Sequence, residues 1–260
     1  MSPAPHPPLP SLLGVFGHPD DEALLAGGVL AQHAAGGAFT SVVTATWAPN
    51  SPRAAELADA LAILGAGSPR MLGFADARNP DSAPGQPRLV DAPLDTVVEL
   101  LVRHIRELRP DIVVTHDVLG QMTGHPDHRR THQITRLAVE AAGLADLYPK
   151  TGDPWQPSAL YAATHSHSGA HDLQQVLAGV GKSALTVPDA YVTTTVDVTP
   201  WLGQKWSAIL AHKGEVARER PLPRLLSRLP QQQRNAIIAR ESFTRLAIGP
   251  VPGLAHQLTC

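Results

Sequence analysis

A histidine and three carboxylates lie close together near the N-terminus, in the segment Gly17-His18-Pro19-Asp20-Asp21-Glu22. Apolar residues 12–16 precede this segment and mostly apolar residues 23–31 follow it, a pattern that predicts a strand, a turn and a buried helix. In open parallel sheets, ligands bind at the edge where the strands end. Because imidazole and carboxylate groups hold divalent metals, we expect this turn to form part of a metal site.

A second His-Pro-Asp sequence opens the segment His125-Pro126-Asp127-His128. His18 and Asp21 are three residues apart, and His125 and His128 have the same spacing. Side chains so spaced where a turn enters a helix can point to one place. A catalytic zinc ion usually has three protein ligands and one position for water. We therefore predict His18 and Asp21 as two ligands, with the third ligand supplied by the second segment.

A metal held in this way would support hydrolysis. Bound zinc lowers the pKa of water to about 7, which provides a nucleophile at neutral pH. Asp20 lies between the two predicted ligands and should point elsewhere, so it could take a proton and pass it to a leaving amine. His125, as an imidazolium, could stabilise a developing oxyanion. The expected reaction is hydrolysis of an amide or a related acyl bond.

The elements that must position these residues alternate between strand and helix. Strands are expected at residues 12–16, 39–46, 70–74, 111–116, 160–164 and 191–198. Helices are expected at residues 22–35, 54–64, 94–108, 125–142, 201–219 and 231–240, with a long loop at 76–93 and a Pro/Arg-rich link at 220–230. This order predicts an α/β fold, a three-layer α/β/α, Rossmann-like arrangement with a mostly parallel sheet.

Composition narrows the class of protein further. The formal net charge is −2 and no basic run is present, so we expect no nucleic-acid partner and no membrane partner. Cys260 is the single cysteine, which excludes an intramolecular disulfide and a cysteine-based zinc site. Residues 1–10 contain five prolines, and we expect a disordered tail there and one domain over 11–260. No signal peptide or apolar span is recognised, so a cytoplasmic protein is predicted, with a homo-oligomer left open.

The two His-Pro-Asp segments, with Gly17 and Gly124 before them, resemble the paired motifs of the PIG-L/LmbE family of zinc-dependent de-N-acetylases. The likeness extends over roughly residues 11–245, although only the two motifs are specific. Weaker matches are Arg53-Ala54-Ala55-Glu56, Leu64-Gly65, Leu72-Gly73-Phe74-Ala75-Asp76, then Lys205, Ala208 and His212, and finally Glu241-Ser242-Phe243.

The resemblance implies a role for individual residues. The implied metal ligands are His18, Asp21 and His128, and zinc is the expected cofactor, with another divalent metal as the alternative. Asp20 would be the general base and acid, His125 would stabilise the oxyanion, Asp127 would orient a histidine from behind, and Arg53 would contact substrate. The chain departs from the family at Thr123, where some sugar deacetylases have tyrosine, and in His212-Lys213-Gly214-Glu215.

Other polar residues have alternative interpretations. Glu22 and Asp127 could each be an ordinary carboxylate in the first turn of a helix, and Glu22 could also support a ligand. His116 and Asp117 end a strand at the expected functional edge and could line the pocket, and His212 is a further candidate for substrate contact. His132 is a rival ligand, one turn beyond His128. The histidines of a second patch are expected in a surface loop: His165, His167 and His171.

The leading functional hypothesis is a metal-dependent hydrolase that removes an N-acetyl group from an amino sugar or a sugar conjugate, such as one containing N-acetylglucosamine. An amidase acting on a thiol conjugate and an antibiotic-tailoring deacetylase remain alternatives, as does a non-catalytic metal- or sugar-binding module. A dinucleotide-binding protein is disfavoured, because the first turn lacks the glycine triplet that admits a pyrophosphate.

Overall fold

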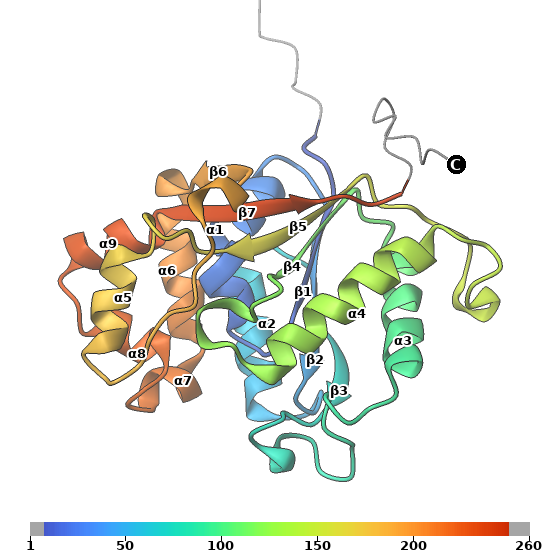
Figure 1. The fold of residues 1–260 in the computed structure, drawn as a ribbon, viewed down its shortest axis with the longest axis horizontal. Coiled ribbons are helices and arrows are strands. Elements are labelled where there is room, and N and C mark those ends of the chain that lie inside the picture. The colour runs from blue at the N-terminus through green and yellow to red at the C-terminus, as the bar shows by residue number, and fades with distance from the viewer. Residues whose placement is uncertain (1–7, 250–260) are drawn as a thin grey trace, which may run out of the picture.

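A computed structural model of the protein (Figure 1) describes residues 8–249. Residues 1–7 lie outside the described part of the chain, so the predicted tail over 1–10 is not tested there. The last stretch of the predicted domain, residues 250–260 with Cys260, also lies outside it.

Seven strands form one sheet within residues 8–249, in the order β3-β2-β1-β4-β5-β7-β6. The strands are β1 (Leu12–Phe16), β2 (Thr40–Thr46), β3 (Arg70–Phe74), β4 (Ile112–His116), β5 (Ala159–Thr164), β6 (Thr194–Asp197) and β7 (Arg240–Leu246). All pairs from β3 to β5 are parallel, and β7 pairs antiparallel with both β5 and β6. The predicted fold class, a mostly parallel Rossmann-like sheet, is therefore confirmed.

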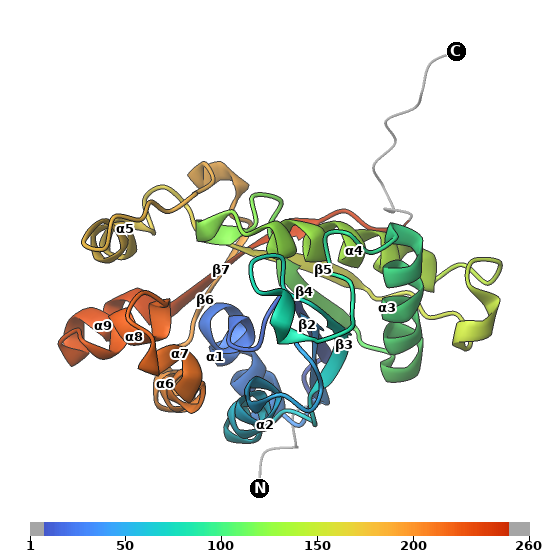
Figure 2. The same ribbon diagram turned by 90° about the horizontal axis from the view of Figure 1, so that it is seen from below.

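Helices cover both faces of this sheet. They are α1 (Asp21–Ala35), α2 (Pro52–Leu64), α3 (Leu94–Leu108), α4 (Pro126–Ala142), α5 (His171–Ala178), α6 (Leu202–Ala211), α7 (Lys213–Ala217), α8 (Leu222–Ser227) and α9 (Gln231–Ile238). Figure 2 shows α1, α2 and α6 on one side and α3 and α4 on the other. Among residues 8–249, every helix is too short or too polar to serve as a membrane span.

The central strand β1 shows why its residues form a buried strand. Leu12 and Phe16 pack into the core under α1, α2 and α6. Leu13 and Val15 point the other way and pack into the core under α3 and α4. Successive side chains of a strand alternate between the two faces, and both faces here are covered, so a continuous apolar run is required.

The α3–α4 layer is fastened by a buried arginine on α3. Arg106 has only 2% of its surface exposed and donates hydrogen bonds to the carbonyl oxygens of Ala141, Ala142, Leu144 and Leu147. These carbonyls lie at the end of α4 and in the turn that follows it. A cation is favoured at the end of a helix, where carbonyl groups lack partners within the helix.

The C-terminal third differs most from the sequence predictions. The predicted helix over 201–219 is interrupted at His212, whose φ of −77° and ψ of 66° are not helical. The predicted link at 220–230 contains the short helix α8, and strand β7 and helix α5 were not predicted at all. In β7 a buried position is filled by Glu241, which pairs with Lys205 at 2.7 Å, so apolar periodicity gave no strand signal there.

Candidate metal and catalytic site

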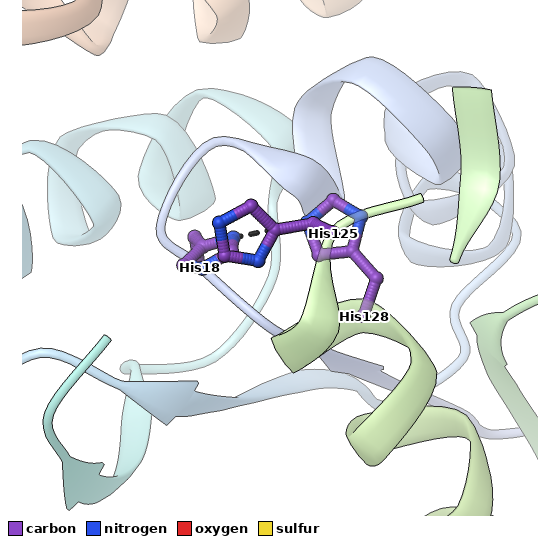
Figure 3. Close-up of side chains that lie close together, drawn as sticks. All are labelled: His18, His125 and His128. Atoms are coloured by element: carbon purple, nitrogen blue, oxygen red, sulfur yellow. Dashed lines mark hydrogen bonds between the residues drawn. The ribbon is translucent and has the colours of Figure 1, made fainter. Parts of the chain in front are cut away.

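Both histidine segments lie at the carboxyl edge of the parallel strands. His18 follows the end of β1 by two residues, and Asp21 begins α1. His125 and His128 stand at the start of α4, after the loop that follows β4 (Figure 3). The glycine at position 17 allows the His128 ring to lie close to the first segment, because a Cβ atom on residue 17 would lie 2.9 Å from Cδ2 of His128.

Three ligand atoms meet at this edge with the spacing expected of a metal site. His18 Nδ1 lies 3.0 Å from His128 Nε2 and 3.4 Å from Asp21 Oδ2. His128 Nε2 lies 3.3 Å from Asp21 Oδ2. Four ligands arranged tetrahedrally at zinc–ligand distances of about 2.0–2.1 Å are separated by about 3.3–3.4 Å. The three atoms therefore fit one face of a zinc tetrahedron.

The far nitrogen of each of the two rings has its own hydrogen-bond acceptor. His18 Nε2 lies 3.2 Å from Asp127 Oδ2 and 3.1 Å from Asp76 Oδ2. His128 Nδ1 lies 3.2 Å from the carbonyl oxygen of Gly120. Each ring therefore places its proton on the far nitrogen and turns a lone pair toward the shared point. Metal-binding histidines are commonly oriented in this way by an outer acceptor.

The charges around these atoms favour a cation. Burial alone would lower the pKa of His18, but hydrogen bonds to Asp127 and Asp21 outweigh burial and raise that pKa well above its usual value. Burial alone would raise the pKa of Asp21, yet the neighbouring His128 and His116 hold it well below its usual range. A proton on His18 thus competes with a metal for this position, and metal binding would release it.

His116 contacts both segments of the site. Its Nε2 accepts a hydrogen bond from the Gly17 backbone N–H at 2.8 Å, so that lone pair is already used. Its ring stacks on the His128 ring with centroids 4.0 Å apart, and its surface is fully buried. Burial lowers the pKa of His116 to about 3, so the ring is neutral at pH 7. Full burial leaves it without a surface that substrate could touch.

Overlapping groups of possible ligands extend beyond the three atoms. Among residues 8–249, these groups are His18–His125–His128, Asp21–His116–His128 and His18–Asp76–His125–Asp127. The first differs from our set in His125, whose Nδ1 accepts the Asp127 backbone N–H at 3.2 Å. We prefer His18, Asp21 and His128, because only in this set do all three ligand atoms have lone pairs free for a metal.

His125 is arranged as a hydrogen-bond donor. Because its Nδ1 accepts from the helix backbone, the proton lies on Nε2, which faces the site 4.0 Å from Asp76 Oδ1. Burial lowers the pKa of His125 to about 4. The ring is therefore a neutral donor at pH 7 and not the imidazolium expected from the sequence.

Asp20 has an unusual backbone conformation. Its φ is 128° and its ψ is −25°, in a region that residues with a side chain rarely adopt. Its Oδ1 lies 3.0 Å from Arg53 Nη2, and its backbone N–H donates to Glu22 Oε2 at 2.9 Å. Burial raises the pKa of Asp20 to about 7, although Arg53 opposes the rise. Such a carboxyl group can both accept and donate a proton near neutral pH.

Two further predicted residues, Arg53 and Asp117, lie near this centre in different surroundings. Arg53 lies beside it, paired with Asp20 and with Glu215 at 3.1 Å, and stacked over Trp47 with its guanidinium carbon 4.6 Å from the ring centre. Asp117 is buried in the loop after β4, where it accepts hydrogen bonds from the Gln121 N–H and the Thr164 hydroxyl at 2.8 Å each.

Glu22 and His212, two of the predicted site residues, form a buried pair. Glu22 Oε1 lies 2.6 Å from His212 Nε2, and both residues have no exposed surface. His132, the rival ligand, instead places Nδ1 2.8 Å from the His116 carbonyl oxygen. The predicted histidine patch divides, because His165 lines a cavity while His171 begins α5 and bonds to Gln175.

Two residues near the centre were not predicted as site residues from the sequence. Asp76 follows β3 and lies against His18, and Glu215 on α7 pairs with Arg53. The signals for Asp76 were its position after a predicted strand on the ligand-binding edge and its place in a segment that weakly resembles the family. Glu215 stands in the segment that departs from the family pattern, so no role could be assigned to it by resemblance.

A cavity of about 670 Å³ is lined in part by residues close in sequence to the two motif segments, although no residue of 17–22 or 124–128 lines it. Its apolar wall includes Leu24, on the first turn of α1, and Met122, in the loop that precedes α4. Its polar wall includes Thr164, Ser166 and Asp172. The cavity therefore presents hydroxyl and carboxylate groups at the same sheet edge as the candidate metal ligands.

Comparison with known proteins gives this geometry a context. The family model described as PIG-L, GlcNAc-PI de-N-acetylase, matches residues 13–139. The 1D-myo-inositol 2-acetamido-2-deoxy-alpha-D-glucopyranoside deacetylase of Rhodococcus jostii strain RHA1 is 38% identical over 242 residues, which cover 79% of this chain and 81% of that protein.

Solved structures show the same fold, and one of them carries the name of a different activity. A conserved protein of Thermus thermophilus superposes with a TM-score of 0.64 at 25% identity, covering 94% of this chain and 99% of that one. GalB, the 4-carboxy-2-hydroxymuconate hydratase of Pseudomonas putida KT2440, superposes with a TM-score of 0.63 at 20% identity, covering 95% and 100%. The fold alone therefore does not determine the reaction, and the site must be argued from its residues.

Proposed function

The chain belongs to the PIG-L family of de-N-acetylases, and we propose that its substrate is an N-acetylglucosamine unit joined to a polyhydroxylated ring such as inositol. Its activity class is that of a deacetylase, a hydrolase of linear amide C–N bonds. This substrate is supported by the name of the Rhodococcus jostii relative, which describes such a conjugate.

The observation that carries the proposal is the meeting of three lone pairs from His18, Asp21 and His128 within 3.4 Å of one another. Two imidazoles and a carboxylate form a donor set suited to zinc. When bound there, zinc supplies Lewis acidity that lowers the pKa of water and polarises an acyl carbonyl. Asp127 and Gly120 keep the two rings in the required tautomers.

Asp20 and His125, which are not among the proposed metal ligands, have complementary roles in the proposed reaction. Asp20, with a pKa near 7, accepts a proton from the attacking water and delivers it to the departing amine nitrogen. His125 donates its Nε2 proton in a hydrogen bond to the carbonyl oxygen as negative charge develops there. The products are acetate and a free amino sugar conjugate.

We assign the cavity beside the site to the ring attached to the amino sugar. Thr164, Ser166 and Asp172 offer hydroxyl and carboxylate groups of the kind that bind sugar hydroxyls. Leu24 and Met122 belong to the cavity wall; Leu24 is on α1, which carries Asp21, and Met122 lies in the loop just before α4, which carries His128. A conjugate could therefore place its acetamido group at the metal and its second ring in the cavity.

The test is amine release from N-acetylglucosaminyl inositol by zinc-loaded protein, measured with a fluorogenic amine reagent and paired with zinc analysis. Asp20→Asn should retain zinc and lose about 10²–10⁴-fold in kcat, the usual contribution of a general acid–base group. Absence of zinc binding by the native chain would refute the metal assignment. Full activity in Asp20→Asn would refute the role of that residue.

A further inference from the structure

The strained backbone at Asp20 makes a hydrogen bond to a buried carboxylate. At φ 128° and ψ −25°, the Asp20 peptide N–H donates to Glu22 Oε2 at 2.9 Å. A residue in such a conformation persists only where its surroundings hold it there. Glu22 has no exposed surface, so water cannot replace this hydrogen bond. The position of the Asp20 carboxylate therefore depends on Glu22.

Glu22 is itself held by a residue 190 positions along the chain. Its other oxygen, Oε1, lies 2.6 Å from His212 Nε2, and His212 is also fully buried. His212 stands at the break between α6 and α7, where the chain leaves helical geometry. Its Nδ1 has no hydrogen-bond partner within residues 8–249, so the polar contact of this ring is directed to Glu22.

We propose that His212 is a positioning residue for the reaction, acting through Glu22 on the backbone of Asp20. The inference rests on the proposed function, in which Asp20 transfers the proton. His212 fixes the Glu22 carboxylate, and Glu22 fixes the peptide N–H of Asp20. The turn is thereby kept in the conformation that directs the Asp20 side chain to Arg53 and away from Asp21.

The metal ligands do not share this support. Asp21 Oδ2 accepts the His18 backbone N–H at 2.8 Å, which closes the ligand turn on itself. The His18 and His128 rings are oriented by Asp127 and by the Gly120 carbonyl. Loss of the His212 contact should therefore displace Asp20 while leaving zinc binding intact, and that difference separates positioning from general structural support.

The experiment is a double-mutant cycle measured on the zinc-loaded full chain with N-acetylglucosaminyl inositol. His212→Ala should lower kcat by about 10–100-fold, the range seen for residues that orient a reacting group, with KM within about twofold and zinc content unchanged. In an Asp20→Asn background the same substitution should have almost no further effect on kcat, because the residue through which it acts is already disabled.

Conservative variants and a matched control complete the design. His212→Gln keeps an N–H donor for Glu22 and should recover most of the lost kcat. If His212→Ala does not fold, Glu22→Gln serves in its place, with about a 10-fold lower kcat expected. His104→Ala, which removes a histidine on α3 that contacts Arg70, should leave kcat unchanged.

Two outcomes would overturn the inference. One is an equal fold loss of kcat in the wild-type and Asp20→Asn backgrounds, which would show that His212 acts independently of Asp20. The other is a wild-type kcat in His212→Ala while Asp20→Asn is impaired. If Asp20→Asn is itself fully active, the proposed role of Asp20 fails instead, so the two failures are distinguishable.

Discussion

Replacing Arg53 with glutamine should move the acid limb of the pH–rate profile to higher pH. Asp20 must be ionised to accept a proton, so activity falls as pH drops through its pKa. Burial raises that pKa to about 7, and the positive charge of Arg53 opposes the rise. Without this charge the pKa of Asp20 increases further, so a smaller fraction of the enzyme is active at any pH on the acid side.

The size of the shift follows from the contact. Arg53 Nη2 and Asp20 Oδ1 are 3.0 Å apart, and the two side chains are 11% and 14% exposed. Unit charges about 4 Å apart interact by about 1 kcal/mol in water and about 4 kcal/mol at an effective dielectric constant of about 20. At about 1.4 kcal/mol for each pH unit, this gives about 1–3 pH units. Glu215 shares the guanidinium at 3.1 Å, so we expect about one pH unit, the low end of that range.

The assay measures kcat/KM from pH 5 to 9 at saturating zinc in each variant. The electrostatic effect of the metal on Asp20 is then the same in every variant that is compared. Arg53→Lys keeps the charge and should keep the acid limb near its wild-type position. Glu215 keeps Arg218 as a partner at 2.9 Å, but its negative charge also raises the pKa of Asp20. The effect of Arg53 is therefore isolated by comparing Arg53→Gln/Glu215→Gln with Glu215→Gln alone. An acid limb at the same or a lower pH in the double variant than in Glu215→Gln would refute the electrostatic argument.

Three other predictions concern the metal, the cavity and the fold. His128→Ala should abolish stoichiometric zinc in dialysed protein measured by mass spectrometry, and retention of one zinc per chain would exclude His128 as a ligand. Ser166→Phe should narrow the cavity and lower kcat/KM for N-acetylglucosaminyl inositol by about 10-fold or more, with little effect on N-acetylglucosamine. An equal effect on both substrates would refute the assignment of the second ring to the cavity. Arg106→Leu should destabilise the protein by about 3 kcal/mol or more in urea unfolding, because several buried carbonyls lose their donor. Arg70→Leu, which breaks a partly exposed pair with Glu107, should cost less than about 1 kcal/mol and is the matched control.

Local patterns in the sequence were sufficient for the parallel part of the fold. Strand β1 was predicted with the bounds that it has, because both its faces are buried and its residues form a continuous apolar run. Each histidine segment also follows a buried strand, so the meeting of His18 with His128 could be anticipated from sheet topology alone. Family and activity class were likewise identified from these two segments and are confirmed by the Rhodococcus jostii relative.

Contacts between distant segments could not be predicted in the same way. Asp76 follows a strand at the ligand-binding edge but lies in a loop without periodicity, so its position did not indicate that it would lie 3.1 Å from His18. Strand β7 was missed because the buried Glu241 replaces an apolar residue and is neutralised by Lys205 on α6. Both cases depend on a buried charge whose partner comes from elsewhere in the chain, and such pairing leaves no trace in hydrophobic patterning.

The adjacent carboxylates of Asp20 and Asp21 explain why strain is concentrated at this turn. In the proposed reaction, Asp21 binds the metal and Asp20 remains free for proton transfer, although consecutive residues at a regular helix start would place both near the same cation. The φ of 128° at Asp20 turns its side chain toward Arg53 instead. That conformation is destabilising by about 1–3 kcal/mol, and the buried Glu22–His212 pair supplies the contact that maintains it. In our proposal, the separate roles of these two aspartates therefore depend on His212, which lies 190 residues beyond Glu22.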